Sequence, residues 1–414
     1  MTASPCGAGE AGEILFLCHR IPFPPDRGDK IRSYHMLQRL AEIAPVHVGC
    51  FADDDRDLSF APALQDIACT QTVLRRERSR LSGGLRGLVQ GQPLLVSLFD
   101  HPDMHAWVKR TLAERPIRAI LAYSVQMAHF VPVLPSDIRF VMDFVDFDSA
   151  KYAAYGREQS GPMAWVNRRE GRKLLAFESA VANRADVSTF VSEAEAALFR
   201  NATGAGEVRV RALENGVALD YFDPAAAFPR LRPEERGEEP LIVFTGQMDY
   251  RPNIEAVESF ARESMPAIRS IRPETRFAIV GRAPSKSVQA LANLPGVLVT
   301  GGVADVRGWL AAADVVVAPL RIARGIQNKV LEAMAMGRPV VASAEAAEGI
   351  DAGDGAHLLV ARIPAQEAGM VLSLLGDPYQ AAALGRAARQ RMVDRYDWDH
   401  TLAVLPDLVM GGAT

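Results

Sequence analysis

A stretch in the second half of the chain, residues 324–343, has the residue types and spacing to bind a phosphate group. Gly325 permits a ligand to approach the backbone closely. A helix is expected from about Gln327 to Met336, and the first N–H groups of a helix have no partner within it, so they attract anions. The backbone at Gly325, Ile326 and Asn328 is therefore a candidate site for the diphosphate of a nucleotide.

Side chains of the same predicted helix are placed to hold the rest of a nucleotide. Asn328 and Glu332 are four residues apart in the sequence and so share one helix face. A carboxylate one turn into the helix can accept hydrogen bonds from ribose hydroxyls, and Lys329 adds a positive charge near the phosphates. The alternative is an ordinary amphipathic helix that ends at Gly337.

The stretch resembles the donor-binding signature of family 4 of the GT-B glycosyltransferases. Within it, residues 324–329 resemble a variant found in the exopolysaccharide sugar transferases associated with PEP-CTERM/exosortase systems. The signature usually reads Glu-x7-Glu followed by Ala-Met-Ala-x-Gly-x-Pro-Val-Val, and residues 333–341 match its second part. The second glutamate matches Glu332, but the first falls on Arg324. The resemblance implies that the carboxylate that binds the nucleoside is kept, whereas the one near the transferred sugar is replaced.

Arg324 is the position where this chain departs from the family pattern. Counting back from Glu332 in steps of four places Asn328 and then Arg324 along one line, if the helical turn extends that far. A guanidinium there is expected to point toward the diphosphate or the transferred sugar, where it can make a forked contact with phosphate oxygens. The alternative is an exposed charge on a loop.

Short apolar runs alternate with longer helical patterns along the chain, which is typical of α/β architecture with parallel sheets. Two sets of strands are expected. They lie at 14–18, 46–51, 119–123, 140–144 and 187–191, and at 241–245, 276–280, 297–300, 315–318 and 339–342.

A segment rich in Pro, Arg and Glu, residues 223–240, separates the two sets and is typical of a linker. With the resemblance, this predicts a GT-B fold of two Rossmann-like domains that face each other across a cleft. Residues 1–222 are expected to form the acceptor-side domain and residues 241–394 the nucleotide-sugar-binding domain. Residues 395–414 are expected to form a helix that crosses back to the first domain.

Loops at the carboxyl ends of parallel strands are where such sheets bind ligands. After the first strand comes a loop with Gly28, flanked by Arg27 and Lys30 as candidate phosphate cations. The resemblance implies a glycine-bearing loop here that faces the diphosphate. Gly246 follows the first strand of the second set, and the resemblance implies the same task for it. The alternative for the charged side chains is a polar surface loop.

The resemblance also implies a basic residue that stabilises the departing diphosphate. Gln247 stands after the glycine where many family members carry an arginine, so the candidates are Arg251, Arg282 and Lys329. Val303, after two glycines, falls where the backbone of family members contacts the nucleobase.

Asp146 and Asp148 follow a buried strand of the first set. Their spacing is the one with which single-domain GT-A transferases hold a divalent metal. Two sets of strands and Glu332 favour the two-domain fold instead, which uses no metal, so no metal site is expected. Asp146 is then a candidate catalytic residue that orients an acceptor hydroxyl or the donor sugar. The alternative is a helix cap or a hydrogen-bonded strand end.

The composition excludes several classes of protein. A formal net charge of −4 provides no overall attraction to nucleic acid. The four cysteines lack metal-ligand spacing, which favours reduced thiols. The sequence shows no apolar run long enough to span a membrane and no signal peptide, so we expect a cytoplasmic protein. Basic residues beside apolar ones at 74–89 suit contact with the inner face of a membrane, or else a solvated loop.

The sequence and the resemblance thus predict a transferase that moves a sugar from a nucleotide-diphosphate sugar to a glycan or polyprenyl-linked acceptor in exopolysaccharide synthesis. The resemblance implies that the reaction retains the anomeric configuration. Its donor is a substrate, and no cofactor is expected. Two alternatives stay open. One is a nucleotide-sugar epimerase of the same fold. The other is a non-catalytic nucleotide-sugar-binding protein, which the replacement at Arg324 suggests.

Overall fold

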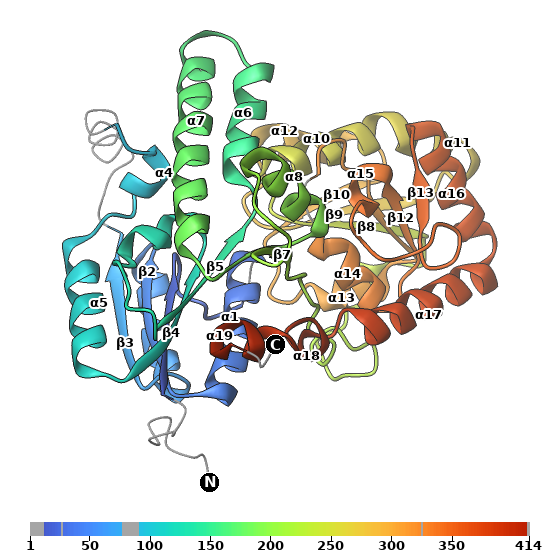
Figure 1. Cartoon of the computed structure of the whole chain (residues 1–414). Helices are drawn as coiled ribbons and strands as arrows, with labels where there is room; N and C mark the ends of the chain where they lie inside the picture. The colour runs from blue at the N-terminus through green and yellow to red at the C-terminus, as the bar shows by residue number, and fades with distance from the viewer. Residues whose placement is uncertain (1–11, 26–27, 77–90, 324–325, 412–414) are drawn as a thin grey trace. The chain divides into compact units, whose positions relative to one another are not determined.

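A computed structural model describes residues 12–25, 28–76, 91–323 and 326–411 (Figure 1). The chain forms two compact units. Unit 1 comprises the described residues up to Glu214 together with the segment from Leu402 onward, and unit 2 comprises Asn215–Thr401. Among the described residues, no helix is both long and apolar enough to cross a membrane.

Unit 1 is built on a parallel sheet of seven strands in the order β3-β2-β1-β4-β5-β6-β7. The strands are β1 (Glu13–Cys18), β2 (Val46–Ala52), β3 (Thr70–Arg75), β4 (Ile117–Tyr123), β5 (Arg139–Val145), β6 (Val187–Phe190) and β7 (Val210–Ala212). The longer helices are α1 (Gly28–Ile43), α5 (Pro102–Glu114), α6 (Asp148–Glu158), α7 (Gly161–Arg184) and α8 (Glu193–Thr203). Shorter ones are α2 (Asp55–Leu58), α4 (Leu94–Ser97), α19 (Leu405–Met410) and the 3₁₀ turns η1 (Ala61–Asp66) and η2 (Val125–Phe130).

Unit 2 is built on a second parallel sheet, of six strands in the order β10-β9-β8-β11-β12-β13. These are β8 (Leu241–Thr245), β9 (Arg276–Val280), β10 (Val297–Gly301), β11 (Val315–Ala318), β12 (Val340–Ser343) and β13 (Leu359–Ala361). The helices are α9 (Pro233–Arg236), α10 (Arg251–Ser259), α11 (Met265–Ile271), α12 (Lys286–Ala290), α13 (Arg307–Ala312), α14 (Asn328–Ala335), α15 (Ala344–Ala347), α16 (Pro364–Gly376), α17 (Pro378–Arg395) and α18 (Trp398–Thr401). A π-helical turn, η3 (Phe260–Ser264), joins α10 to α11, and a 3₁₀ turn, η4 (Leu291–Asn293), follows α12.

The predicted two-sheet architecture is confirmed, and the reason lies in the strands themselves. Strands of a parallel sheet are covered by helices on both faces, so they are continuous apolar runs rather than alternating ones. Every residue of β1 and of β8 is buried, for example. The edge strands β3 and β7, and β13 in the second sheet, were not predicted. Edge strands are less buried, and β3 (Thr70–Arg75) is exposed at both ends.

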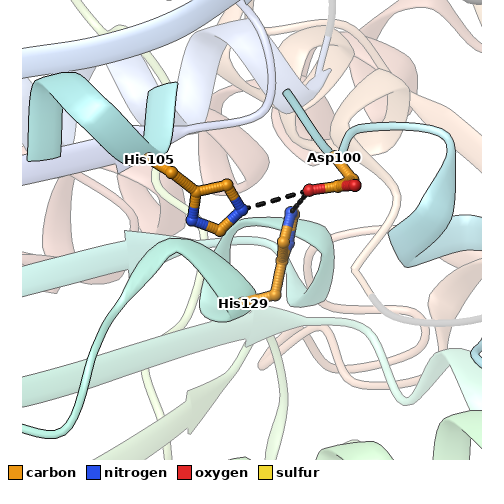
Figure 2. Close-up of side chains that lie close together, drawn as sticks. All are labelled: Asp100, His105 and His129. Carbon is orange, nitrogen blue, oxygen red and sulfur yellow. Dashed lines mark hydrogen bonds and ion pairs between the residues drawn. The ribbon is translucent and has the colours of Figure 1, made fainter. Parts of the chain in front are cut away.

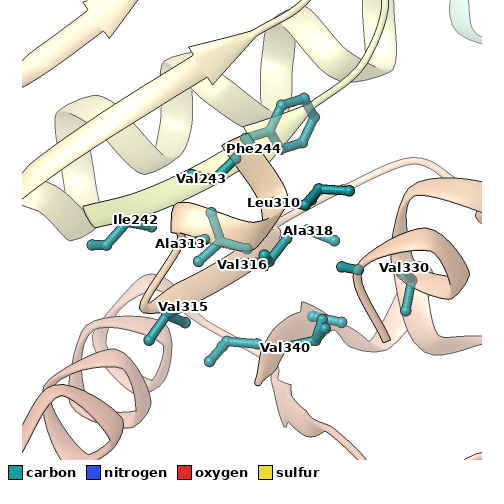
Figure 3. Packing of buried hydrophobic residues seen from close by; sticks show 14 of the residues in the cluster. Ile242, Val243, Phe244, Leu310, Ala313, Val315, Val316, Ala318, Val330 and Val340 are labelled. Carbon is teal, nitrogen blue, oxygen red and sulfur yellow. The ribbon is translucent and has the colours of Figure 1, made fainter. Parts of the chain in front are cut away.

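Each unit has its own hydrophobic core. In unit 2, Val243 and Phe244 of β8 pack with Val316 of β11 and Val330 of α14 (Figure 3). Removing one such side chain from water contributes about 1.5–3 kcal/mol. The contact through Val330 holds α14 against the carboxyl half of the sheet, which fixes where the first turn of this helix lies.

The boundaries of the units differ from those expected. Residues 223–240 belong to unit 2, because Phe228 and Leu231 pack against its core and Arg236 donates to Asp314 at 3.0 Å. At the other end, α18 also belongs to unit 2, and the chain re-enters unit 1 only at Leu402. There the backbone carbonyl of Leu408 accepts a hydrogen bond from Arg139, which joins α19 to β5.

Candidate functional site

The start of α14 lies at the end of the loop that follows β11. Gln327 is the N-cap residue of this helix and has an extended backbone, and its side chain makes no capping hydrogen bond. The Gln327 side chain therefore leaves the first N–H groups of the helix uncovered, as an anion site requires. Arg324 and Gly325 lie outside the described residues. Ile326 is buried in the core of unit 2, so a role in binding falls to its backbone alone.

Lys329 and Asn253 form the polar centre of this region. The Nζ of Lys329 donates to the Asn253 Oδ1 at 2.8 Å and lies 5.2 Å from the centre of the Phe244 ring. The Asn253 Nδ2 in turn donates to the backbone carbonyl of Gln247 at 2.9 Å. Burial lowers the pKa of Lys329 to about 8, although the nearby Glu332 acts in the opposite direction. An ammonium that is costly to keep charged gains strongly from a bound anion.

Glu332 lies one turn further along α14 and is half-buried. Burial raises the pKa of its carboxyl group to about 7, against the lowering effect of Lys329. Among the residues that the structure describes, none donates a hydrogen bond to this carboxylate. Its neighbour Asn328 accepts a long bond of 3.5 Å from Asn215. A half-buried carboxylate that receives no hydrogen bond from the described residues favours a ligand that brings hydroxyl groups.

Three loops with glycines at the carboxyl ends of β8, β9 and β10 stack backbone against backbone. Gly246 N–H donates to Val280 at 3.0 Å, and Gly281 N–H donates to Gly301 at 3.1 Å. A Cβ atom on Gly281 would lie 1.6 Å from the carbonyl oxygen of Gly246, so only glycine fits there. A Cβ atom on Gly246 would lie 3.4 Å from the Lys329 Cε, which places this stack directly beside α14.

Two further predicted residues lie around the glycine stack. Arg282 is exposed, and its backbone carbonyl accepts from Met248 at 2.9 Å, so it adjoins the loop after β8. A Cβ atom on Gly302 would lie 3.4 Å from that of Arg282. Val303 is the next residue and packs against the core of unit 2. Unit 2 thus brings Gly246, Arg282 and Lys329 to one edge of its sheet.

Arg251 has a different environment from the one expected for a phosphate cation. Its side chain is exposed, and its Nε donates to Glu255 at 2.7 Å within α10. Asn253, in contrast, was not predicted as a site residue. The sequence did contain a signal for Asn253. Pro252 follows a glycine loop and is typical of a helix start, so Asn253 lies in the first turn of α10, where it is buried.

In unit 1, the predicted Gly28 is the first residue of α1. The neighbouring Lys30 is almost completely buried and donates to Asp57 at 2.7 Å. It is thus already paired within unit 1, and Arg27 lies outside the described residues. Arg20, which precedes this loop, is likewise paired with Asp53 at 2.7 Å.

Asp146 is half-buried and follows Val145, whose φ angle of +71° is unusual for a β-branched residue. Asp148 begins α6, and burial raises the pKa of its carboxyl group to about 7. Burial likewise raises the pKa of Glu178 to about 8. Within the described residues, Asp146 and Asp148 do not converge with a third metal-ligand side chain.

A cavity of about 770 Å³ in unit 2 lies elsewhere. It is lined by Asp314 and Pro339, which precede β11 and β12, so it opens at the amino ends of the strands. The predicted residues lie at the opposite, carboxyl edge.

Comparison with known proteins agrees with this geometry. Residues 239–377, which include β8–β13 and α14, match the family model of the glycosyl transferases group 1. The chain is 32% identical over 251 residues to the GDP-mannose-dependent alpha-(1-6)-phosphatidylinositol monomannoside mannosyltransferase of Mycolicibacterium smegmatis. That match covers 56% of this chain and 64% of the relative, less than two thirds of its length.

Solved structures show the same fold over nearly the whole chain. Sucrose-phosphate synthase from Thermosynechococcus elongatus has a TM-score of 0.67 and 20% identity, with 96% of this chain and 98% of that chain covered. HepE from Anabaena, in complex with UDP and glucose, has a TM-score of 0.66 and 18% identity, with the same coverage. The chain therefore has the GT-B fold, and its residues 239–377 are similar to the group 1 glycosyl transferases.

Proposed function

We propose that this protein is a retaining glycosyltransferase that moves a hexose from a nucleotide-diphosphate sugar to a glycan or lipid-linked acceptor. The observation that carries the proposal is the position of Lys329 and Glu332. The lysine adjoins the glycine stack and the start of α14. The Glu332 carboxylate, which receives no hydrogen bond from the described residues, follows one turn later. The pair offers a cation for phosphate and an acceptor for ribose hydroxyls within the group 1 domain.

The names of similar proteins support the class of donor and acceptor. The mycobacterial relative is GDP-mannose-dependent and acts on phosphatidylinositol monomannoside, a lipid-linked acceptor. HepE was solved with UDP and glucose. We infer a nucleotide-sugar donor for this chain too, and a lipid-linked acceptor met at the inner face of a membrane. Assignment to exopolysaccharide synthesis rests on the resemblance at residues 324–341.

In the proposed reaction, the bond between the anomeric carbon and the diphosphate breaks, and the diphosphate leaves with the electron pair. The acceptor oxygen forms the new bond on the same face of the sugar and gives up its proton, which the leaving diphosphate can take. Stabilising the departing charge is then the main task of the protein. Backbone N–H groups at 325–328, Lys329 and Arg324 are proposed for this task, and Asp146 is proposed to orient the acceptor or the sugar.

The decisive assay is acceptor-dependent release of nucleoside diphosphate together with a new glycan mass. GDP-mannose, UDP-glucose and related donors would be tested against lipid-linked acceptors. Glu332→Ala should weaken donor binding, whereas Glu345→Ala, which removes an exposed glutamate of the same unit, should not. Release of altered sugar without acceptor would support the epimerase instead, and donor binding without turnover would support a non-catalytic protein.

A chelator separates the metal-free reaction from a metal-dependent one. With phosphate charge met by helix N–H groups and cations, transfer should continue in EDTA at temperatures where the protein stays folded. Complete loss of activity that Mn²⁺ or Mg²⁺ restores would instead support a metal at Asp146 and Asp148.

A further inference from the structure

Three metal-ligand side chains of unit 1 converge at a place that the proposed transfer reaction does not use (Figure 2). Asp100 precedes α5, His105 lies on α5, and His129 lies on η2, which follows β4. Each residue offers one ligand atom, and these atoms all lie within 4.8 Å of one another. Segments separated in sequence thus present one carboxylate and two imidazoles to a common point.

The distances within this cluster approach those of a metal site. The Asp100 Oδ1 lies 3.1 Å from the His105 Nε2 and 3.7 Å from the His129 Nε2. Metal–ligand bonds of about 2.0–2.1 Å in a tetrahedral site hold the ligand atoms roughly 3.4 Å apart. Small rotations of the two imidazole rings are enough to reach this spacing.

The hydrogen bonding of His129 fixes which of its nitrogen atoms faces the cluster. Its Nδ1 lies 2.7 Å from the backbone carbonyl of Gln126, which can only accept, so Nδ1 carries the proton. Metal-binding histidines are oriented in this way by a backbone carbonyl or a carboxylate. The Nε2 of His129 then carries a lone pair. This atom is buried, and no described residue forms a hydrogen bond with it.

A cation placed in the cluster would supply the partner that the His129 Nε2 lacks among the described residues. This nitrogen lies 3.7 Å from the Asp100 Oδ1, so a cation between the two atoms would contact both the nitrogen lone pair and the carboxylate. A buried polar atom that is otherwise unsatisfied is stabilised by such a partner.

We propose that Asp100, His105 and His129 bind a divalent transition metal ion of the Zn²⁺ type, with water in the open position. Two imidazoles and one carboxylate favour Zn²⁺ or Co²⁺ over Mg²⁺ and Ca²⁺, which prefer oxygen ligands alone. The His105 side chain is 44% exposed, which provides a path for entry. The ion would link α5 to η2 and stabilise unit 1, and this role is independent of the proposed transfer reaction.

The test uses the full-length protein, freed of any affinity tag and stripped of metal. Addition of Co²⁺ should produce visible absorption bands of a low-symmetry site, and one equivalent of Zn²⁺ should abolish them. Zn²⁺ should also raise the melting temperature, because it binds the folded state. His129→Ala and Asp100→Asn should each weaken binding by about tenfold or more.

His105→Ala should stay folded even if the other two variants do not, because this side chain is exposed. It therefore tests the loss of a ligand separately from a loss of folding. The matched controls are His101→Ser, which keeps a cap on α5, and His357→Ala in unit 2. Both controls should bind the metal as the unchanged protein does. The proposal is overturned if no stoichiometric binding occurs, or if His105→Ala and His129→Ala bind Co²⁺ as tightly as the unchanged protein.

Discussion

Donor affinity should depend on pH in a bell-shaped manner, because the two groups proposed to hold the donor titrate near neutrality. The pKa of Glu332 is raised to about 7 and that of Lys329 is lowered to about 8. Ribose hydroxyls need an ionised Glu332 as acceptor, and phosphate needs a charged Lys329. Both conditions hold together only in a narrow window between the two values.

The size of the effect follows from these values. One pH unit below its pKa, a carboxyl group is ionised in about one molecule in eleven, so affinity should fall about sixfold from its maximum by pH 6. One pH unit above its pKa, Lys329 is charged to the same small extent, and affinity should fall by about sixfold near pH 9. Each limb thus corresponds to about 1.4 kcal/mol of binding free energy per pH unit.

Calorimetric titration with the intact nucleotide sugar between pH 5.5 and 9.5, at constant ionic strength, measures this profile. A free nucleoside diphosphate is unsuitable, because its terminal phosphate titrates near pH 6 itself. Glu332→Gln should remove the acid limb. Lys329→Met should remove the alkaline limb and move the acid limb to higher pH, because the lysine charge lowers the pKa of Glu332.

A flat profile for the unchanged protein would refute this reasoning. So would an acid limb that persists with the same midpoint in Glu332→Gln, since the titrating group would then lie elsewhere.

Three further predictions concern other positions. Arg324→Glu should reduce turnover more than Arg324→Lys does, because the glutamate brings negative charge toward the phosphate. If Arg324→Glu turns over as fast as the unchanged protein, the charge of the arginine has no role. Gly281→Ala should lower donor affinity and reduce the free energy of unfolding by about 1–3 kcal/mol, because the new Cβ atom would lie 1.6 Å from a carbonyl oxygen. Gly302→Ala is the control: its Cβ atom would have its nearest contact at 3.4 Å, so this variant should be tolerated. Glu178 has a pKa raised to about 8 in the folded protein, so the folded state holds more protons than the unfolded state and stability should fall as pH rises from about 5 to 8. Glu178→Gln should flatten this fall in urea unfolding, and an unchanged slope would contradict it.

The two sheets could be predicted from the sequence because their central strands are buried on both faces. Such strands are apolar over most of their length, as β1 shows after Glu13 and β8 shows before Thr245. Strand β3 (Thr70–Arg75) could not be recognised in this way, because it lies at an edge and only two of its residues, Val73 and Leu74, are apolar. Strands that are buried on both faces can therefore be recognised from a single sequence.

The part of the candidate site that lies within one short sequence motif could be predicted. The part that is formed by residues far apart in the sequence could not. Glu332 and Lys329 belong to one short helix, so their spacing was visible. The bond between Lys329 and Asn253 joins residues 76 positions apart, and nothing in the sequence relates them. The cluster of His105 and His129 likewise depends on how α5 packs beside η2, and its spacing matches no sequence motif.

The glycine stack has a consequence for how donor choice can change. Main-chain N–H and C=O groups are the same in every residue, so a surface built from Gly246, Gly281 and Gly301 offers almost nothing that substitution can adjust. A variant with a new preference for sugar or base must therefore draw it from neighbouring side chains. Gln247 and Arg282 flank the stack and can vary without closing the backbone contact. Libraries that aim at altered donor preference should keep the three glycines and randomise these two flanking positions.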